Sequence, residues 1–201
     1  MGQHKRVAHA GKISGVNEIA LAKAQLRSKI LASRVGREPA TEALTGNLLE
    51  LVSQLKAQSV ATYLSFGAEP STTTFISALL NNGIEVLVPK VLQDGTLSWF
   101  KWDGVSTVTS NLGMLDPDAS KLTQVSVSQA ELLIIPALAV DVEGNRLGRG
   151  KGFFDRELEQ LGSSQVYAVC FEDEFFESLP SEAHDQIVSG VVTEVAIHEL
   201  N

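Results

Sequence analysis

The residues best suited to chemistry lie together in one glycine-rich stretch, residues 146–156. It reads Arg146-Leu147-Gly148-Arg149-Gly150-Lys151-Gly152-Phe153-Phe154-Asp155-Arg156. The apolar run 132–135 comes before it, so a buried strand leads through a loop to a helix N-terminus. Glycines let backbone N–H groups approach a ligand, and the helix dipole adds positive potential. Arg149 and Lys151 add full charges, so the stretch predicts a polyphosphate-binding site.

A plainer interpretation of this stretch is a glycine-rich turn with solvated charges. Its spacing matches neither the Walker A motif nor the Rossmann dinucleotide fingerprint. However, four cations and a carboxylate fall within eleven residues, and this clustering favours an anion site over a simple turn.

Three acidic residues are candidates for ligand contacts. Asp155 stands in the first turn of the helix that follows the stretch, where an acid also stabilises the helix dipole without any ligand. Mg²⁺ usually takes one or two carboxylates together with substrate phosphates, so Asp155 is a candidate ligand and Asp185 a second one. Glu69 follows a predicted strand and is either an exposed loop acid or an acceptor for the N–H donors of a heterocycle.

The charges divide the chain into a basic beginning and an acidic remainder. Residues 1–37 hold eight of the sixteen Lys and Arg and one acid, whereas the other 164 residues hold eight basic and twenty-three acidic residues. Half of those later basic residues lie in the glycine-rich stretch, which focuses positive potential there. Nucleic-acid binding would need a wider basic face with interleaved aromatics, so we expect no nucleic-acid partner.

Length and composition indicate a globular protein. With 201 residues, 44% of them hydrophobic, the chain is large enough for a substantial core. No apolar run approaches the roughly 18 residues of a membrane span, and no secretory signal is evident. Cys170, the one cysteine, lies in an apolar run and is expected to be a buried structural thiol. We expect a cytoplasmic monomer without membrane contact.

The elements that must position these residues alternate between helix and strand. We expect a flexible tail over 1–16 and one domain over 17–201. Asn17 can cap a first helix on which Lys23 and Arg27 share a face, either as a solvated pair or as ligand contacts. Further helices are predicted at 41–56, 71–80 and 153–161, with a short helical turn at 175–179, and strands at 59–64, 84–88, 132–135, 166–171 and 191–195.

This order predicts an α/β fold, a single doubly wound domain with a mostly parallel sheet. Asp94-Gly95 marks a hairpin that puts Phe100 and Trp102 on one face and Trp99 on the other. Pro89 is expected to stop its strand, and residues 103–128 to be irregular. Ligands of such folds bind at the carboxyl ends of the strands, where loops 65–70, 137–152 and 172–185 should meet.

The residues in five patches resemble one family, the 5-formyltetrahydrofolate cyclo-ligases, also called methenyltetrahydrofolate synthetases. The patches follow the family's order over roughly residues 18–197: 23–27 (Lys-Ala-Gln-Leu-Arg), 63–69 (Tyr-Leu-Ser-Phe-Gly-Ala-Glu), 88–90 (Val-Pro-Lys), 136–155, and 179–194. Two positions depart from the usual pattern. Phe153-Phe154 replaces a frequent Tyr-Tyr pair, and Ala137 replaces a usual glycine.

The resemblance implies ATP- and Mg²⁺-dependent conversion of 5-formyltetrahydrofolate to 5,10-methenyltetrahydrofolate, ADP and phosphate, on a CoA-transferase-like Rossmann-type core. It implies folate contacts at Leu64 and Glu69, Mg²⁺ ligands at Asp155 and Asp185, and catalytic charges at Arg149 and Lys151. It also implies that ATP contacts Lys23, Ala24, Gln25, Leu26, Arg27, Arg146, Leu147, Gly148, Arg149, Gly150, Lys151, Gly152, Phe153 and Phe154.

The implied chemistry needs positioning and charge neutralisation more than a side-chain nucleophile. Phosphorylation of the formyl oxygen would let N10 attack the activated carbon and expel phosphate. Two alternatives remain from the sequence: a folate- or nucleotide-binding regulator on the same fold, and a related transferase acting on phosphorylated or CoA-linked substrates. An ATP-dependent assay separates all three.

Overall fold

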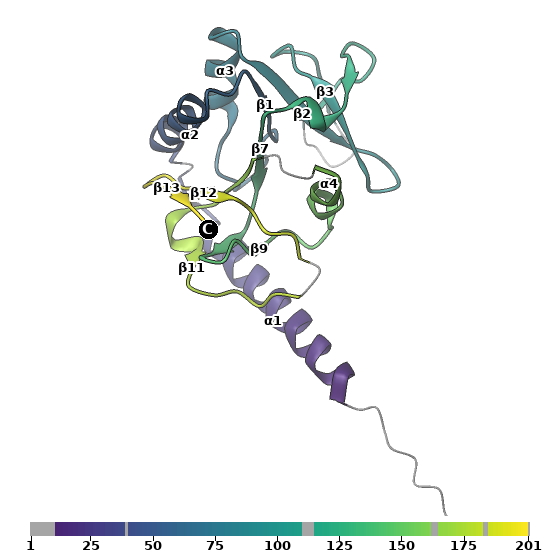
Figure 1. The fold of residues 1–201 in the computed structure, drawn as a ribbon. Helices are drawn as coiled ribbons and strands as arrows, with labels where there is room; N and C mark the ends of the chain where they lie inside the picture. The colour runs from purple at the N-terminus through teal and green to yellow at the C-terminus, as the bar shows by residue number, and fades with distance from the viewer. Residues whose placement is uncertain (1–10, 39, 110–114, 162–164, 183–184, 201) are drawn as a thin grey trace, which may run out of the picture.

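A single eight-stranded sheet organises the computed structural model, which describes residues 11–38, 40–109, 115–161, 165–182 and 185–200 (Figure 1). The strand order is β13 (Ile197–Glu199), β12 (Gly190–Val192), β10 (Gln165–Val169), β7 (Leu132–Pro136), β1 (Ser59–Ala61), β2 (Glu85–Val91), β3 (Leu97–Lys101) and β6 (Gln124–Val125). The central strands β12, β10, β7, β1 and β2 are parallel, whereas β13 and β3 pair antiparallel with their inner neighbours. The predicted α/β fold with a mostly parallel sheet is confirmed.

Helices cover both faces of this sheet. On one face, α2 (Thr41–Leu55) and α3 (Thr73–Asn81) pack leucine and phenylalanine side chains against Val60, Val86 and Leu132. On the other face, α4 (Phe153–Leu161) packs Leu158 against alternate residues of the same strands. Burial on both faces explains why β7 is a continuous apolar run.

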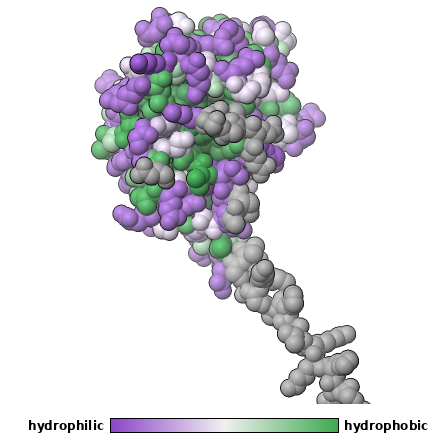
Figure 2. All heavy atoms as spheres, viewed as in Figure 1, coloured by the Kyte–Doolittle hydropathy of each residue, from purple (hydrophilic) through white to green (hydrophobic). Residues whose placement is uncertain are grey.

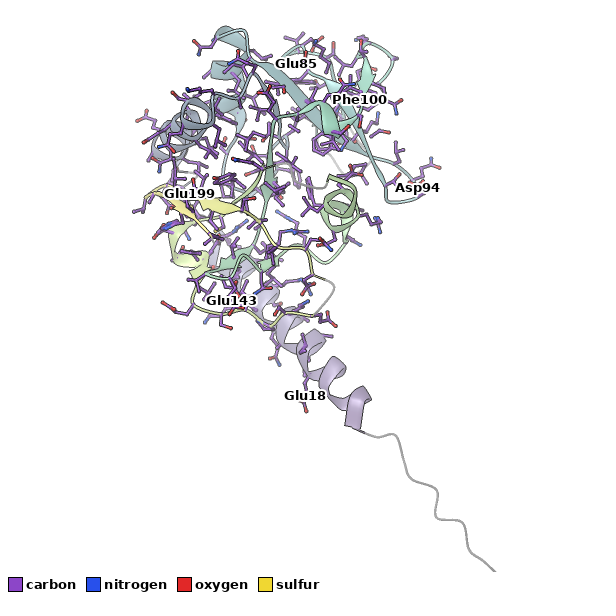
Figure 3. All side chains as sticks on the ribbon, viewed as in Figure 1. Glu18, Glu85, Asp94, Phe100, Glu143 and Glu199 are labelled. Atoms are coloured by element: carbon purple, nitrogen blue, oxygen red, sulfur yellow. The ribbon has the colours of Figure 1, made fainter. Side chains whose placement is uncertain are left out.

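The helix α1 (Gly11–Ser33) extends away from the body of the molecule, and only its C-terminal half is packed against it (Figure 1). Its start corrects the sequence prediction, because Asn17 lies inside the helix and is not its cap. Of the predicted tail, residues 1–10 lie outside the described residues. Figure 3 shows Glu18 on the extended part of α1.

Helix α1 docks on a small second sheet of strands β11 (Phe175–Phe176), β8 (Ala139–Asp141) and β9 (Arg146–Leu147). Ile30 of α1 is buried there against Leu138, Leu147 and Leu179. Strand β11 replaces the helical turn predicted at 175–179, and the 3₁₀ turn η2 (Glu172–Glu174) comes just before it. Strands β8 and β9 of this sheet lie between β7 and α4 in the chain, so the connection predicted as a loop holds a hairpin.

Strand β2 runs through Pro89, which the sequence prediction placed at its end. Trp102 N donates to Val86 O, so Val86 and every second residue after it hydrogen-bond to β3. Pro89 falls between these positions, and its backbone nitrogen therefore faces β1, on the other side of β2. On that side β1 ends at Ala61, and the last bond of its pairing with β2 runs from Thr62 N to Leu87 O, two residues before Pro89. Proline therefore removes no hydrogen bond of the sheet at this position.

The predicted hairpin between β2 and β3 is present, with Gly95 at φ 79° in its turn and Asp94 at its tip (Figure 3). Trp99 and Trp102 are buried in the cores on opposite sides of the sheet, as alternation predicts. Residues 103–128 hold more structure than expected: β4 (Thr107–Thr109), β5 (Leu115–Pro117), β6 and the 3₁₀ turn η1 (Val127–Gln129).

Hydrophilic side chains cover most of the face seen in Figure 2, with hydrophobic groups exposed between them. Large exposed hydrophobic residues come from separate elements and include Leu21, Val35, Val105 and Ile187. Within the described ranges, no helix combines the length and the apolar character needed to cross a membrane. Cys170 is buried, and burial raises the pKa of its thiol well above the usual value, which agrees with a structural role.

Candidate functional site

The strand order reverses between β1 and β7. The chain passes from β1 to β2 in one direction along the sheet and from β7 to β10 in the other. The loops that follow the carboxyl ends of β1 and β7 therefore diverge, which is where open α/β sheets bind ligands. The first of these loops carries Glu69, and the second connection carries β8, β9 and the glycine-rich loop 148–152.

The glycine-rich loop joins β9 to the N-terminus of α4. Gly150 and Gly152 have φ values of 85° and 65°, a region that favours glycine. Arg27 Nε donates to Gly148 O over 2.9 Å, and a Cβ added at Gly150 would lie 3.4 Å from the Arg27 guanidinium. The loop and α1 thus fit each other closely, and the absence of a side chain at Gly150 is part of that fit.

Two cations on one face of α1 and Arg34, in the turn just after its last residue, reach three different loops. Lys23 reaches the segment 182–185, Arg27 reaches the glycine-rich loop, and Arg34 reaches η2. Spacings of four and seven residues keep these side chains on one helical stripe. The predicted shared face of Lys23 and Arg27 is confirmed, and it points at the protein and not at solvent.

Arg146 lies behind the glycine-rich loop with a nearly buried side chain. Its guanidinium forms an ion pair with Asp155 and donates to Gln186 O over 2.6 Å. Burial lowers the pKa of Arg146 from its usual value, although the charges of Asp155 and Asp185 favour the protonated form. Two carboxylates, Asp155 of α4 and Asp185 of a later loop, therefore favour the charged form of one guanidinium.

Lys23 is buried between two acids, with Nζ 2.6 Å from Asp185 Oδ2 and 3.0 Å from Glu182 Oε2. Burial alone would lower the pKa of Lys23, but the hydrogen bonds to Asp185 and Glu182 outweigh it and raise the pKa. Asp185 also accepts from Glu182 N over 2.7 Å. The two carboxylates predicted as metal ligands, Asp155 and Asp185, thus each pair with a cation of the site.

These carboxylates fit Mg²⁺ in the type of donor. Mg²⁺ prefers hard oxygen ligands and usually takes only one or two from the protein. The described part of the chain holds no group of three or more His, Cys, Asp or Glu arranged for a metal ion. A magnesium ion here would consequently need oxygens from a bound phosphate as well.

Arg149 and Glu69 join the two diverging loops, with Arg149 Nε 3.0 Å from Glu69 Oε1. The second oxygen of Glu69 accepts from Phe66 N, also over 3.0 Å. Lys151 is exposed at the far end of the glycine-rich loop, and Leu64 is partly buried against the core.

Some predicted contact residues point elsewhere. Ala24 and Gln25 are exposed, away from the buried stripe of α1. Leu26 and Leu147 pack in the small core beneath α1. Phe154 packs edge-on against Trp99, with ring centroids 6.5 Å apart. Phe153 lies beside Gly95, so the hairpin tip reaches the start of α4.

The sequence interpretation did not identify a buried ion pair beneath the site. Arg34 donates from Nε and Nη2 to both oxygens of Glu174, over 2.7 and 2.6 Å, and from Nη2 to Ala137 O over 2.8 Å. Glu174 Oε2 also accepts from Phe171 N. The only signal was the continuation of the cationic stripe, since Arg34 follows Arg27 by seven residues.

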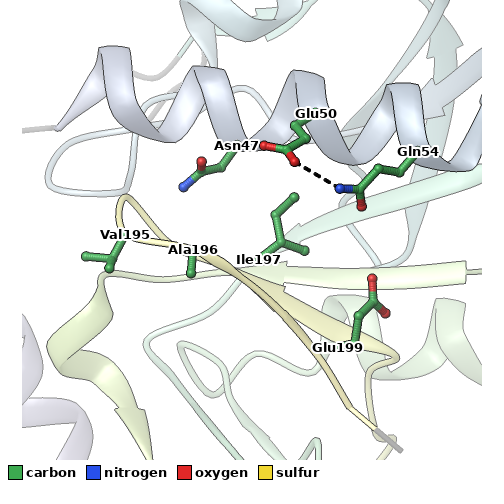
Figure 4. A pocket seen from close by; sticks show the side chains of 7 residues that line it. All are labelled: Asn47, Glu50, Gln54, Val195, Ala196, Ile197 and Glu199. Atoms are coloured by element: carbon green, nitrogen blue, oxygen red, sulfur yellow. Dashed lines mark hydrogen bonds between the residues drawn. The ribbon is translucent and has the colours of Figure 1, made fainter.

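A separate groove of about 380 Å³ lies between α2 and the β12–β13 hairpin (Figure 4). Its walls are Asn47, Glu50, Gln54, Val195, Ala196, Ile197 and Glu199. Asn47 donates to Thr193 O, Gln54 donates to Glu50, and Tyr167 donates to Glu199. It contains none of the predicted ligand-binding residues, so its size does not make it the candidate site.

Comparisons with known proteins point to one family. The model of the 5-formyltetrahydrofolate cyclo-ligase family matches residues 20–194. The 5-formyltetrahydrofolate cyclo-ligase of Mycolicibacterium smegmatis is 35% identical over 182 residues, which cover 85% of this chain and 93% of that protein. The Escherichia coli K12 enzyme of the same name is 29% identical over 170 residues, which cover 82% of this chain and 91% of that protein.

Solved structures give the same result. The 5,10-methenyltetrahydrofolate synthetase of Aquifex aeolicus is similar with a TM-score of 0.78 and 28% identity, covering 89% of this chain and 93% of that one. The 5,10-methenyltetrahydrofolate synthetase of Mycoplasma pneumoniae has a TM-score of 0.69 and 19% identity, covering 86% of this chain and 98% of that one. At this identity the similarity supports the fold alone.

Proposed function

Because the chain belongs to the 5-formyltetrahydrofolate cyclo-ligase family, we propose that it converts 5-formyltetrahydrofolate to 5,10-methenyltetrahydrofolate and consumes ATP. Members of this family are ligases. The observation that supports the proposal best is the convergence of Arg27, Arg146 and Arg149 on one glycine-rich loop at the reversal of strand order. A folate ligase needs an anion site and a heterocycle site side by side, and we propose that the two diverging loops supply them.

The nucleotide half of the proposal rests on charge and backbone. We propose that Lys23, Arg27, Arg146, Arg149 and Lys151 surround the phosphates of ATP. The backbone of Gly148, Gly150 and Gly152 and the N-terminus of α4 add N–H groups and positive dipole potential. Within this set, Arg149 and Lys151 are exposed enough to reach a bound ligand directly.

Asp155 and Asp185 would hold Mg²⁺ together with the phosphates. When bound, the ion would neutralise negative charge on the phosphate oxygens. Arg146 and Lys23, which pair with these carboxylates in the free chain, carry charges that suit phosphate oxygens equally well. The charges of these groups can therefore be neutralised both in the free chain and with ligands bound.

The folate half rests on the loop after β1. Glu69 has a carboxylate at the switch point, and Leu64 contributes apolar surface beside it. A carboxylate accepts hydrogen bonds from paired N–H donors, which a reduced pterin ring offers. We propose that Glu69 orients the ring so that the formyl group faces the glycine-rich loop.

The reaction then follows from positions and charges. The formyl oxygen attacks the γ-phosphorus of ATP, forming a P–O bond as the bond to ADP breaks, and the carbon becomes electrophilic. N10 attacks this carbon and gives up its proton, and the C–O bond breaks with release of phosphate. Arg149 and Lys151 stabilise the charge that moves between phosphate oxygens in the first step. No covalent bond to a side chain is needed.

We further propose that the parallel core is CoA-transferase-like and of Rossmann type, and that the enzyme works as a monomer. The crossovers through α3 and α4 on opposite sheet faces support the first point.

The direct test is formation of the methenyl product from purified protein, 5-formyltetrahydrofolate, ATP and Mg²⁺, followed by its absorbance. We expect the absorbance to rise only when all three additions are present. Binding of folate or nucleotide without ATP consumption would instead indicate a regulator. No ATP-dependent absorbance at any enzyme concentration would remove the proposal.

A further inference from the structure

The ion pair between Arg149 and Glu69 joins the two halves of the proposed site. Arg149 stands in the loop proposed to bind phosphates, and Glu69 stands in the loop proposed to bind folate. Two other cations of the site pair with acids of the nucleotide half, namely Lys23 with Asp185 and Arg146 with Asp155. Among the described residues, the Arg149–Glu69 contact is the ion pair that crosses from one substrate loop to the other.

The surroundings of this pair allow it to exchange partners. The Arg149 side chain is 44% exposed, and glycines precede and follow it, so it can turn towards another anion. The Glu69 side chain is 12% exposed and is fixed by Phe66 N. Glu69 therefore stays in place while Arg149 can leave. Arg34, buried and bonded to both oxygens of Glu174, shows the contrasting case of a fixed pair.

We propose that Glu69 couples folate binding to nucleotide binding by holding Arg149 until folate arrives. This inference rests on the proposed function. N–H donors of the bound ring satisfy the Glu69 carboxylate, and Arg149 is released to the phosphates of ATP. In the absence of folate, nucleotide binding must first break the pair, so ATP alone binds more weakly than ATP with folate.

The size of the coupling follows from the exposure of the pair. A partly exposed ion pair contributes up to about 1 kcal/mol, which corresponds to roughly a fivefold change in affinity. By thermodynamic linkage the effect is reciprocal, so nucleotide must tighten folate binding by the same factor. A pair without this exchange would leave the two affinities independent.

Titration calorimetry with a non-hydrolysable ATP analogue and Mg²⁺ tests the coupling. For the wild-type protein, we expect saturating 5-formyltetrahydrofolate to lower the Kd of the analogue about fivefold. Glu69→Gln should bind the analogue tightly without folate, and added folate should change its Kd little. Arg149→Gln should bind folate alone more tightly than the wild type, because Glu69 is then unpaired. Both variants gain affinity, which misfolding cannot imitate.

Glu182→Gln is the matched control for charge. It removes one negative charge beside Lys23, outside the Arg149–Glu69 pair. Its affinity for the analogue should rise, yet its folate effect should stay about fivefold as in the wild type. If Glu69→Gln behaves like this control, its effect is general electrostatics and the coupling is refuted.

Two other results would overturn the inference. One is an unchanged analogue Kd when folate is added to the wild-type protein, and the other is weaker folate binding by Arg149→Gln. Product formation separates these failures from failure of the proposed function. A wild-type protein that forms the methenyl product without coupled binding loses only this inference, whereas one that forms no product loses both.

Discussion

The buried pair between Arg34 and Glu174 should be the anchor of α1, and Arg34→Met tests this. Methionine keeps much of the length and packing of arginine but removes its charge and three hydrogen bonds, two to Glu174 and one to Ala137 O. Glu174, itself 2% exposed, would then keep only the bond from Phe171 N. Stranding a buried charge in this way costs about 3–5 kcal/mol.

Urea unfolding, followed by the fluorescence of the buried Trp99 and Trp102, measures this loss. For a chain of this size, 3–5 kcal/mol corresponds to a decrease in Tm of about 6–20 °C. Because α1 carries Lys23 and Arg27 to the nucleotide loops, the KM for ATP should also rise more than the KM for folate.

Two comparisons make the test specific. Arg37→Met removes a neighbouring, partly exposed arginine that pairs with Asp173 and Glu194 and lies over the Phe171 ring, so it should cost about 1–2 kcal/mol, less than Arg34→Met. The double variant Arg34→Met/Glu174→Met should be more stable than Arg34→Met, because no buried charge is left unpaired. If Arg34→Met costs no more than Arg37→Met, the anchoring role of the pair is wrong.

Three further perturbations address the site and the core. Gly150→Ala should raise the KM for ATP several-fold, because Gly150 has φ 85° and its added Cβ would meet Arg27. Gly148→Ala is the control and should change the KM little, because the space around Gly148 is open. Equal effects of the two substitutions would contradict the close fit between α1 and the glycine-rich loop. Lys151→Glu should lower kcat strongly, whereas Lys121→Glu, at a lysine in an exposed pair with Asp118, should leave kcat unchanged. Steady-state rates of product formation measure both effects. A fully active Lys151→Glu variant would remove Lys151 from the site. Burial raises the pKa of the Cys170 thiol, so the native protein should not react with a thiol reagent at pH 8. The unfolded protein should react. Rapid labelling of the native protein would show that the thiol is accessible.

Local patterns predicted the elements with strong periodicity. The boundaries of α4 agree with the prediction, because its apolar period, the preceding glycines and the following Gly162 all mark the same helix. Strands β8, β9 and β11 are only two or three residues long, so no alternation can reveal them. Pro89 misled the prediction because its effect depends on where the neighbouring strand β1 ends, which the local sequence does not contain.

The site was predictable in its composition but not in its pairing. Charge clustering identified Arg146, Arg149 and Asp155 as one group, and helical spacing put Lys23 beside Arg27. Which acid neutralises which cation depends on how the loops cross at the sheet edge, and the sequence contains no sign of that. The buried Arg34–Glu174 pair is the extreme case, because its two members are 140 positions apart.

The docking of α1 also has a consequence for the order of folding. Arg27 contacts a carbonyl 121 positions later, and Lys23 contacts acids 159 and 162 positions later. Such long-range contacts should form only after the intervening chain has folded. Before that, closing so large a loop costs conformational entropy that the few contacts of α1 cannot offset. During synthesis α1 therefore emerges well before its partners in these later segments. The helix that contributes Lys23 and Arg27 to the proposed nucleotide site should therefore dock late, after the sheet has formed.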